Sequence, residues 1–123
     1  GLAGAVRRQA AAVAPDLGVE LEVTGDLSGL PAAVGVAAYR IVVEALTNAA
    51  RHSGSDTVTA ALSADAGALT IEVHDRGAKR QGRWKAGVGM SSMRERAAEI
   101  GGSIEVGPGD TGGRVRARLP LSV

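Results

Sequence analysis

The chain has 123 residues, of which 45% are hydrophobic and 22% charged, and its formal net charge at pH 7 is +1. This composition is typical of one compact globular domain; it excludes an intrinsically disordered chain and gives no support to nucleic-acid binding. The absence of cysteine excludes disulfides and thiolate metal sites and fits an intracellular setting, and no apolar run approaches the roughly 18 residues of a membrane span. We therefore expect one domain over residues 1–123 without membrane contact.

The first half of the chain is predicted to form a helix, a strand and a longer helix. Residues 2–14 show an amphipathic helical pattern that Pro15 ends, and residues 19–23 alternate apolar and acidic side chains, as a half-buried strand does. The longest helical pattern covers residues 31–52 and starts with a proline, which the first turn of a helix tolerates. Its apolar side chains form one stripe that is expected to be buried: Val34, Ala38, Ile41, Val42, Ala45 and Ala49.

A hairpin and a loop are predicted next. Residues 57–63 and 69–75 alternate in polarity and are separated by a short polar segment, which predicts two antiparallel strands. Residues 76–89 have no clean period and carry four glycines, which indicates a loop.

A third helix and a second hairpin complete the predicted elements. The helix is expected over residues 93–100, because Ser92 and Glu95 have capping-box spacing and two glycines lie past its end. Strands are expected at residues 103–106 and 114–119. Strands and helices do not alternate strictly along the chain, so we expect an α+β fold with one mixed sheet and helices packed on one face.

Three polar side chains follow one border of the apolar stripe of the long helix. Glu44, Asn48 and His52 are spaced four residues apart, so they form a ridge on one side of the helix. The amide oxygen of Asn48 suits the oxygen shell of Mg²⁺, which phosphates and waters would complete, and Glu44 is placed to polarise a water or a hydroxyl. The alternative is an ordinary solvated helix border, and the spacing taken alone favours that alternative.

The strand over residues 69–75 ends in an acid. Asp75 has the same parity as the apolar residues Leu69, Ile71 and Val73, so its side chain is expected to point inward. An ionised group there is costly unless a partner pairs with it, and the exocyclic amine of a purine is one such partner. The alternative is an aspartate that starts a turn and points to solvent, and the parity leaves both open.

The segment after Asp75 is basic and rich in glycine. Its five cations have no acid among them: Arg76, Lys79, Arg80, Arg83 and Lys85. Such a loop suits closure over a polyphosphate, and the backbone N–H groups of Gly87, Val88 and Gly89, ahead of a helix, suit anion binding. Basic loops are common, so an ordinary solvated loop is the alternative.

In their order these features resemble the ATP-binding (GHKL, or Bergerat) fold shared by histidine kinases, type II topoisomerases and MutL. AAYRIVVEALTNAARHS is similar to the N box of two-component sensor histidine kinases, HDRG to their first glycine box and RVRARLPL to their closing strand. GVGMSSMRERAAEIGGSIEV resembles the second glycine box and following helix of the subfamily that signals to NarL-type response regulators. The resemblance covers nearly the whole chain and implies a two-layer α/β sandwich with a mixed, largely antiparallel sheet.

The resemblance implies roles for the matching residues. Glu44 would be the acid that assists phosphoryl transfer, and Asn48 would be a Mg²⁺ ligand. Arg51 and His52 would lie near the phosphates of ATP, and Asp75 would accept a hydrogen bond from the adenine amine. The glycine boxes would supply the remaining contacts to the nucleotide, at Gly77, Gly87, Val88, Gly89 and Met90.

The resemblance also implies partners and a location. The γ-phosphoryl group of MgATP would pass to a histidine on a dimerisation helical hairpin of the same kinase, for relay to a NarL-type response regulator. Neither His52, in the N box, nor His74, on a strand, matches that phosphoacceptor. The isolated domain is therefore expected to be monomeric, cytoplasmic and unable to phosphorylate itself.

Three positions depart from the pattern of the family. Lys79 stands where the second glycine of the first glycine box is usual, and Ser92 (or Ser91, depending on alignment) replaces a usual glycine near the methionine of the MRERA segment. Gly112-Gly113 stands where a glycine-threonine pair is usual. These departures leave open a degenerate nucleotide-binding fold that serves as a protein docking surface. A serine kinase of the anti-sigma-factor type, with the same fold, is a further alternative that the MRERA segment argues against.

Overall fold

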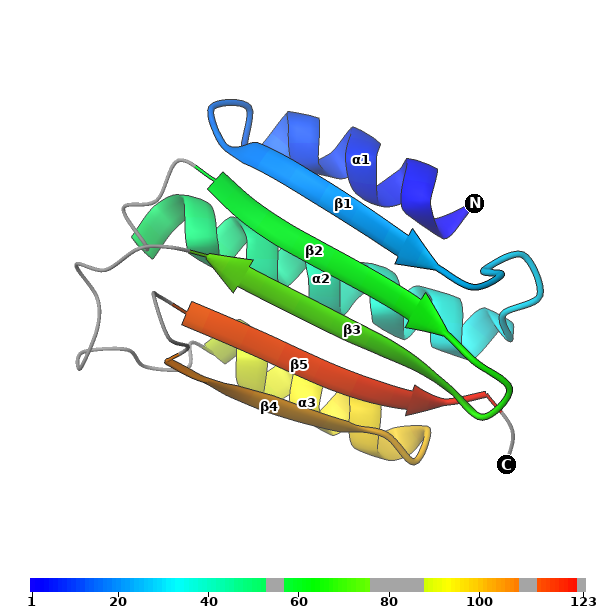
Figure 1. Ribbon diagram of the computed structural model, residues 1–123. Helices are drawn as coiled ribbons and strands as arrows, with labels where there is room; N and C mark the ends of the chain where they lie inside the picture. Colours follow the sequence, from blue (N-terminus) through cyan, green and yellow to red (C-terminus); the bar gives the residue numbers. More distant parts are fainter. Residues whose placement is uncertain (53–56, 76–87, 109–112, 122–123) are drawn as a thin grey trace.

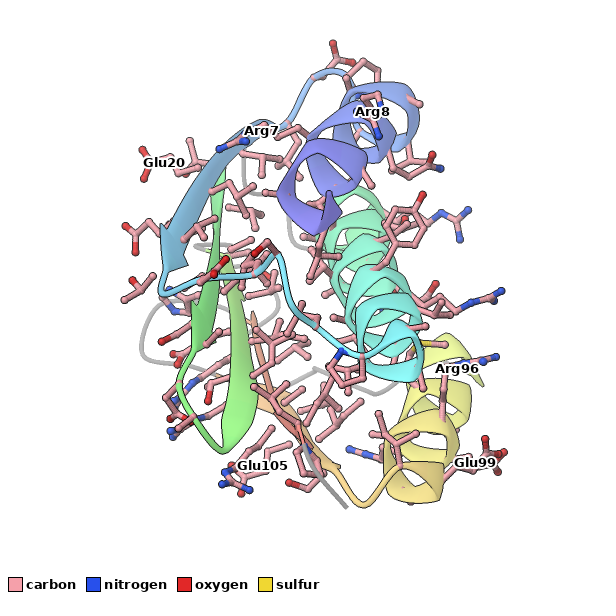
Figure 2. The ribbon with its side chains drawn as sticks, turned by 90° about the vertical axis from the view of Figure 1, so that its right-hand side faces the viewer. Arg7, Arg8, Glu20, Arg96, Glu99 and Glu105 are labelled. Atoms are coloured by element: carbon pink, nitrogen blue, oxygen red, sulfur yellow. The ribbon has the colours of Figure 1, made fainter. Side chains whose placement is uncertain are left out.

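The computed structural model describes residues 1–52, 57–75, 88–108 and 113–121, whose helices and strands form two layers. In chain order the elements are α1 (Leu2–Val13), β1 (Gly18–Thr24), α2 (Ala32–His52), β2 (Thr57–Ala64), β3 (Ala68–Asp75), α3 (Val88–Glu99), β4 (Ser103–Pro108) and β5 (Gly113–Pro120). The strands make one sheet in the order β1-β2-β3-β5-β4, and the helices lie on one face of it (Figures 1 and 2). β1 and β2 are parallel and the other neighbours are antiparallel. The predicted α+β sandwich with a mixed, largely antiparallel sheet is confirmed.

α2 is the central helix of the helical layer: it packs on β3 and β5 of the sheet and lies between α1 and α3. All six residues of the predicted apolar stripe are buried, as are Ala37 and Leu46. Each fully buried Ile, Val or Leu side chain stabilises the fold by about 1.5–3 kcal/mol. α1 adds Val6 and Ala10 to the same core, and it ends just before Pro15, as predicted.

β2 and β3 form the predicted hairpin, and Asp65 fixes its turn. Oδ1 of Asp65 accepts the backbone N–H groups of Gly67 at 2.7 Å and Ala68 at 2.8 Å. These two bonds stabilise the carboxylate and lower the pKa of Asp65, and the charge of Arg118 contributes in the same direction. The turn is therefore held by donors from within the hairpin itself.

The two faces of the sheet differ in burial, and in β1 this difference is confined to residues 18–22. In β5, Val115, Ala117 and Leu119 are buried, whereas the intervening arginines are exposed, as predicted. Figure 2 shows Glu20 and Glu105 projecting from the open face, opposite the helices. β1 buries less than the predicted alternation requires, because it is an edge strand: Val23 is 42% exposed.

α3 begins at Val88, five residues before the predicted start, so the capping-box prediction for Ser92 is wrong. Gly89 led to the expectation of a loop, but it occupies the first turn, where glycine costs only about 1 kcal/mol. Burial of Met93 and Ala97 against the core offsets that cost. The helix ends as predicted: Gly101 has φ of 79°, and Gly102 N–H donates to the carbonyl of Ala97 at 2.8 Å, a Schellman motif.

α2 is also apolar over a long stretch, although the sequence shows no uninterrupted apolar run there. Over Ala32–Arg51 it is long and apolar enough, by length and composition, to cross a membrane. Its apolar residues are interrupted by polar ones, which is why no continuous run marks it. A long core helix passes the same test, and here the apolar stripe of α2 packs against β3 and β5.

Candidate functional site

Several of the predicted site residues lie at one end of the two layers: Asn48 near the end of α2, Asp75 at the end of β3, and the first turn of α3. The C-terminal ends of α2 and β3 lie there together with the N-terminal ends of α3 and β5, at the left of Figure 1. α2 packs directly on β3 and β5, so Asn48 and Asp75 belong to neighbouring elements at the same end. The opposite end holds the turn between β2 and β3.

Asp75 is the clearest candidate at this end. It is the last residue of β3 and only 9% exposed, and among the described residues it is the one buried charged side chain. The inward orientation predicted from strand parity is confirmed, and the alternative of a solvent-facing aspartate is wrong. Oδ1 of Asp75 accepts the backbone N–H of Gly113, the first residue of β5, at 3.1 Å. A carboxylate accepts about four donors on its two oxygens, so this group suits binding of an amine as well.

Asn48, Arg51 and His52 follow the last turns of α2. Asn48 is half-buried, on the border between the buried stripe and the surface, where the ridge spacing places it. Arg51 is exposed. His52 ends the helix, and its side chain lies outside what the structure describes. Whether these three side chains meet phosphate and metal stays a prediction.

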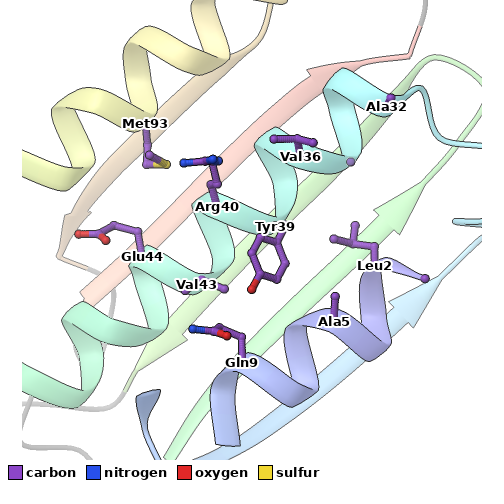
Figure 3. A pocket seen from close by; sticks show the side chains of 12 residues that line it. Leu2, Ala5, Gln9, Ala32, Val36, Tyr39, Arg40, Val43, Glu44 and Met93 are labelled. Atoms are coloured by element: carbon purple, nitrogen blue, oxygen red, sulfur yellow. The ribbon is translucent and has the colours of Figure 1, made fainter. Parts of the chain in front are cut away.

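Glu44 lines a groove of about 880 Å³ on the side of the helices that faces away from the sheet (Figure 3). α1 and α2 form its two walls, and Met93 of α3 closes one side. Arg40 and Glu44 project from α2 towards α3, whereas Tyr39 projects towards α1 (Figure 3). Glu44 is half-buried and Arg40 exposed, so a group that approaches from solvent can reach the Glu44 carboxylate.

The glycine-box residues are only partly described. Val88, Gly89 and Met90 form the first turn of α3, which corrects the expectation that the first two belong to a loop. The N–H groups of a first helical turn have no partner within the helix, so the donors expected from a loop are available at this helix start instead. Gly77 and Gly87 lie outside the described residues, so their roles stay predictions.

The described residues contain no group of three or more His, Cys, Asp or Glu side chains that could hold a metal ion unaided. The oxygen donors at this end are the half-buried amide of Asn48 and the carboxylate of Asp75. Glu44 lines the groove described above, and the residues of that groove include neither Asn48 nor Asp75. Mg²⁺ prefers oxygen ligands, keeps several waters and is often held by one or two protein groups together with substrate phosphates. Asn48 fits that donor set as a single protein ligand.

Gly113 also contributes to this end, a role that the sequence motifs did not predict. In the sequence it only departs from a family pattern, but in the structure its N–H donates to the Asp75 carboxylate. The strand register explains this contact: β3 and β5 pair Val73 with Val115 and His74 with Arg114, which brings Gly113 opposite Asp75. The sequence pattern does not reveal this register.

Comparison with known families and proteins gives consistent matches. The family described as histidine kinase-, DNA gyrase B- and HSP90-like ATPase matches residues 33–123. Sensor histidine kinase YxjM of Bacillus subtilis is 35% identical over 107 residues, which cover 82% of this chain and 26% of YxjM. Matches to such curated relatives cover most of this chain but only about a quarter of the length of each relative.

Solved structures resemble the chain over nearly its full length. The ATP binding domain of PrrB from Mycobacterium tuberculosis has a TM-score of 0.71 and 25% identity, and the match covers 99% of this chain and 93% of that domain. The histidine kinase domain of a blue-light activated histidine kinase from Erythrobacter litoralis EL346 has the same TM-score and identity, with coverage of 98% and 61%.

Proposed function

The chain belongs to the histidine kinase-, DNA gyrase B- and HSP90-like ATPase family, and from that premise we propose that it is the ATP-binding catalytic domain of a two-component sensor histidine kinase. It binds MgATP, and its γ-phosphoryl group passes to a histidine on a dimerisation hairpin. The observation that carries this proposal is the buried Asp75 carboxylate, held by the backbone at the end where α2, β3, α3 and β5 meet.

Asp75 recognises the adenine base. Its carboxylate accepts a hydrogen bond from the exocyclic amine of adenine, and that bond repays part of the cost of burying the charge. Gly77 follows it by two residues and makes room for the base. A base held at this point directs the phosphates towards α2 and the first turn of α3, where the N–H groups near Val88, Gly89 and Met90 face the anion.

Asn48 would hold the metal that accompanies the phosphates. Its amide oxygen would be one ligand of Mg²⁺, and phosphate oxygens and waters would supply the others. Mg²⁺, when bound, neutralises charge on the phosphates and thereby favours transfer. Arg51 is exposed and lies about one helical turn after Asn48, and it adds positive charge near the phosphate chain. His52 adds a hydrogen-bond donor there.

Glu44 acts on the acceptor and not on the nucleotide. Its half-buried carboxylate lines the open groove, so the imidazole of a histidine from a separate hairpin can approach it. Glu44 then accepts the imidazole proton as the new P–N bond forms and the bond to the ADP oxygen breaks. In-line geometry supplies much of the rate, since well-oriented reactants gain about 7–11 kcal/mol over free ones.

The partners follow from the same proposal. The phosphoacceptor lies on the dimerisation hairpin of the kinase, and the phosphoryl group continues to a NarL-type response regulator in the cytoplasm. Support for that subfamily comes from the segment GVGMSSMRERAAEIGG, which occupies α3 and its C-terminal turn from Val88 onward.

Labelling of a fusion protein tests the phosphotransfer. We expect the chain fused to a dimerisation hairpin to place acid-labile, base-stable label from γ-labelled ATP on the hairpin, whereas the chain alone gains no label. Fusion should outperform mixing because it raises the effective concentration of the hairpin to about the millimolar range. Glu44→Gln in the fusion should slow labelling by about 10²–10⁴-fold and leave ATP affinity unchanged.

A thermal shift separates this function from a docking role. MgATP at about 100 times its dissociation constant should stabilise the chain by about 2.7 kcal/mol, and a fold that has lost nucleotide binding should show no shift. A chain that binds MgATP but labels serine on a protein substrate, and never the hairpin, would show that the fold is right and the chemistry wrong.

A further inference from the structure

The hydrogen bond between Asp75 and Gly113 joins two strands in an unusual way. In β3 and β5 the paired residues closest to this point are His74 and Arg114. One step further, the backbone N–H of Gly113 donates to Oδ1 of the Asp75 side chain, across 38 residues of sequence and within the buried layer. The donor is therefore part of the backbone at the start of β5, and the acceptor is the one buried charged side chain of the described residues.

A backbone donor in a sheet is well suited to hold a side chain in one orientation. Gly113 pairs with Pro108 of β4, and the next residue, Arg114, pairs with His74 of β3, so the backbone that carries the Gly113 N–H is held within the sheet. Bonding one carboxylate oxygen to a fixed donor sets the torsion of the Asp75 side chain and so the direction of the second oxygen. A backbone donor adds no side-chain rotamers of its own that have to be ordered, unlike a flexible side-chain donor.

Given the proposed function, on which this inference rests, we propose that the backbone N–H of Gly113 is a positioning group that sets the selectivity of the domain for adenine over 6-oxopurines. Adenine carries an amine donor at position 6, whereas guanine and hypoxanthine carry a carbonyl acceptor there. A carboxylate oxygen in a fixed orientation accepts a hydrogen bond from the amine of adenine. It binds a 6-oxopurine less tightly, because the carboxylate oxygen and the carbonyl oxygen at position 6 are both acceptors. A carboxylate that rotates freely discriminates less.

Inosine triphosphate is the sharpest probe, because it carries the carbonyl at position 6 and lacks the 2-amino group of guanine. We expect the wild-type chain to bind ATP at least about tenfold more tightly than ITP. In Asp75→Asn the amide oxygen keeps the Gly113 N–H, so the amide nitrogen is turned towards the base and donates to its carbonyl. The ATP-to-ITP affinity ratio should therefore fall below one in this variant.

Loss of the donor tests Gly113 directly. Gly113→Pro removes the N–H at the first residue of a strand, where proline is tolerated, and Gly113→Ala is the matched control that keeps it. In Gly113→Pro the ratio should move towards one, and in Asp75→Asn combined with Gly113→Pro the inverted preference should disappear. A double variant whose ratio stays within twofold of that of Asp75→Asn overturns the proposal. A wild-type chain that binds no nucleotide rejects the proposed function instead.

Amide hydrogen exchange gives a second reading that does not depend on proline at position 113. The Gly113 amide should exchange slowly in the wild type and in Asp75→Asn, which both keep an acceptor, and at least about tenfold faster in Asp75→Leu, which has none. Equally slow exchange in all three proteins would mean that the bond to Asp75 does not hold this part of β5, and the positioning role would fall.

Discussion

The two ends of the β2–β3 hairpin each carry an aspartate whose carboxylate accepts backbone N–H groups. At the turn, exposed Asp65 takes its donors from Gly67 and Ala68, its near neighbours in sequence. At the far end, buried Asp75 takes a donor from Gly113, 38 residues away on another strand. Both residues are aspartates that accept backbone N–H groups. They differ in where the donor comes from along the chain and in how deeply the carboxylate is buried.

This difference separates a structural aspartate from a functional one. Asp65 completes a turn and is exposed, so water and the backbone N–H groups of the turn stabilise its carboxylate without a ligand. Asp75 is charged in a buried layer, where a carboxylate is tolerated only if donors surround it, and its site is assembled from distant segments. A carboxylate of the second kind, at an end where several elements meet, is the better indicator of a binding site.

The largest effect should come from exchanging each aspartate for asparagine and measuring ATP affinity by calorimetry. Asp75→Asn should weaken ATP by about 10–100-fold, because a hydrogen bond to a charged group contributes about 1.5–3 kcal/mol. Asp65→Asn, the matched control on the same hairpin, should leave the affinity unchanged. Comparable losses in the two variants would contradict the distinction.

The reverse result is expected for stability. Asp65→Ala removes the acceptor of two turn N–H groups and should lower the Tm by a few degrees, with nucleotide affinity intact. Differential scanning calorimetry measures the first quantity, and the ATP titration of the variant supplies the control. An unchanged Tm would mean that hydrogen bonds from the Gly67 and Ala68 N–H groups to water stabilise the turn as well as those to Asp65.

The stability contributed by Asp65 should depend on pH. The N–H groups of Gly67 and Ala68 lower the pKa of Asp65, so its stabilising effect is present above the ordinary aspartate pKa of about 3.9 and is lost as pH falls through the lowered value in the folded state. The Tm difference between wild type and Asp65→Asn should thus be constant from pH 7 to 5 and disappear towards pH 2. Asp26, whose pKa is lowered by the Ser28 hydroxyl and N–H, is present in both proteins and cancels.

The smallest effect concerns the residue beside Gly113. Arg114 Nε lies 3.1 Å from Oε1 of Glu72 on the open face, and both side chains are about 40% exposed. Arg114→Gln should change the free energy of unfolding by less than about 0.5 kcal/mol, since exposed ion pairs contribute little. ATP affinity should stay unchanged, because the variant leaves the backbone at Gly113 intact. A large loss of ATP affinity in Arg114→Gln would indicate that the nucleotide is bound on the open face of the sheet.

Much of the fold was predictable because periodicity records burial. The α2 stripe around Ile41 and the alternation of β5 around Ala117 were both predicted correctly. Strand parity indicated an inward Asp75 but left a solvent-facing turn open, and the structure shows the inward orientation. The N-box ridge correctly placed Asn48 at the edge of the stripe, half-buried. Its proposed role as a metal ligand is a separate prediction, since the ridge describes position and not chemistry.

Features that depend on contacts between distant segments were not predictable in this way. The local sequence pattern predicted a loop at Val88 and Gly89, whereas the structure has a helix there. The start of this helix is stabilised by packing of Met93 on the core, and the local pattern does not contain that contact. Val23 lost its expected burial because strand order, and not alternation, decides which strand lies at an edge. The role of Gly113 required the register of β5 against β3.

The strand order also sets an order of events during folding. β2 and β3 are joined by residues 65–67, so their pairing closes a short loop, whereas β1 can pair with β2 only across the whole of α2. Closing a longer loop costs more entropy, so we expect the hairpin to form early and the β1 and β5 pairings to follow. The turn at Asp65 is then complete as soon as the hairpin exists. The end that holds Asp75 gains its Gly113 donor only when β5 arrives, so nucleotide binding should appear in the last kinetic phase of refolding.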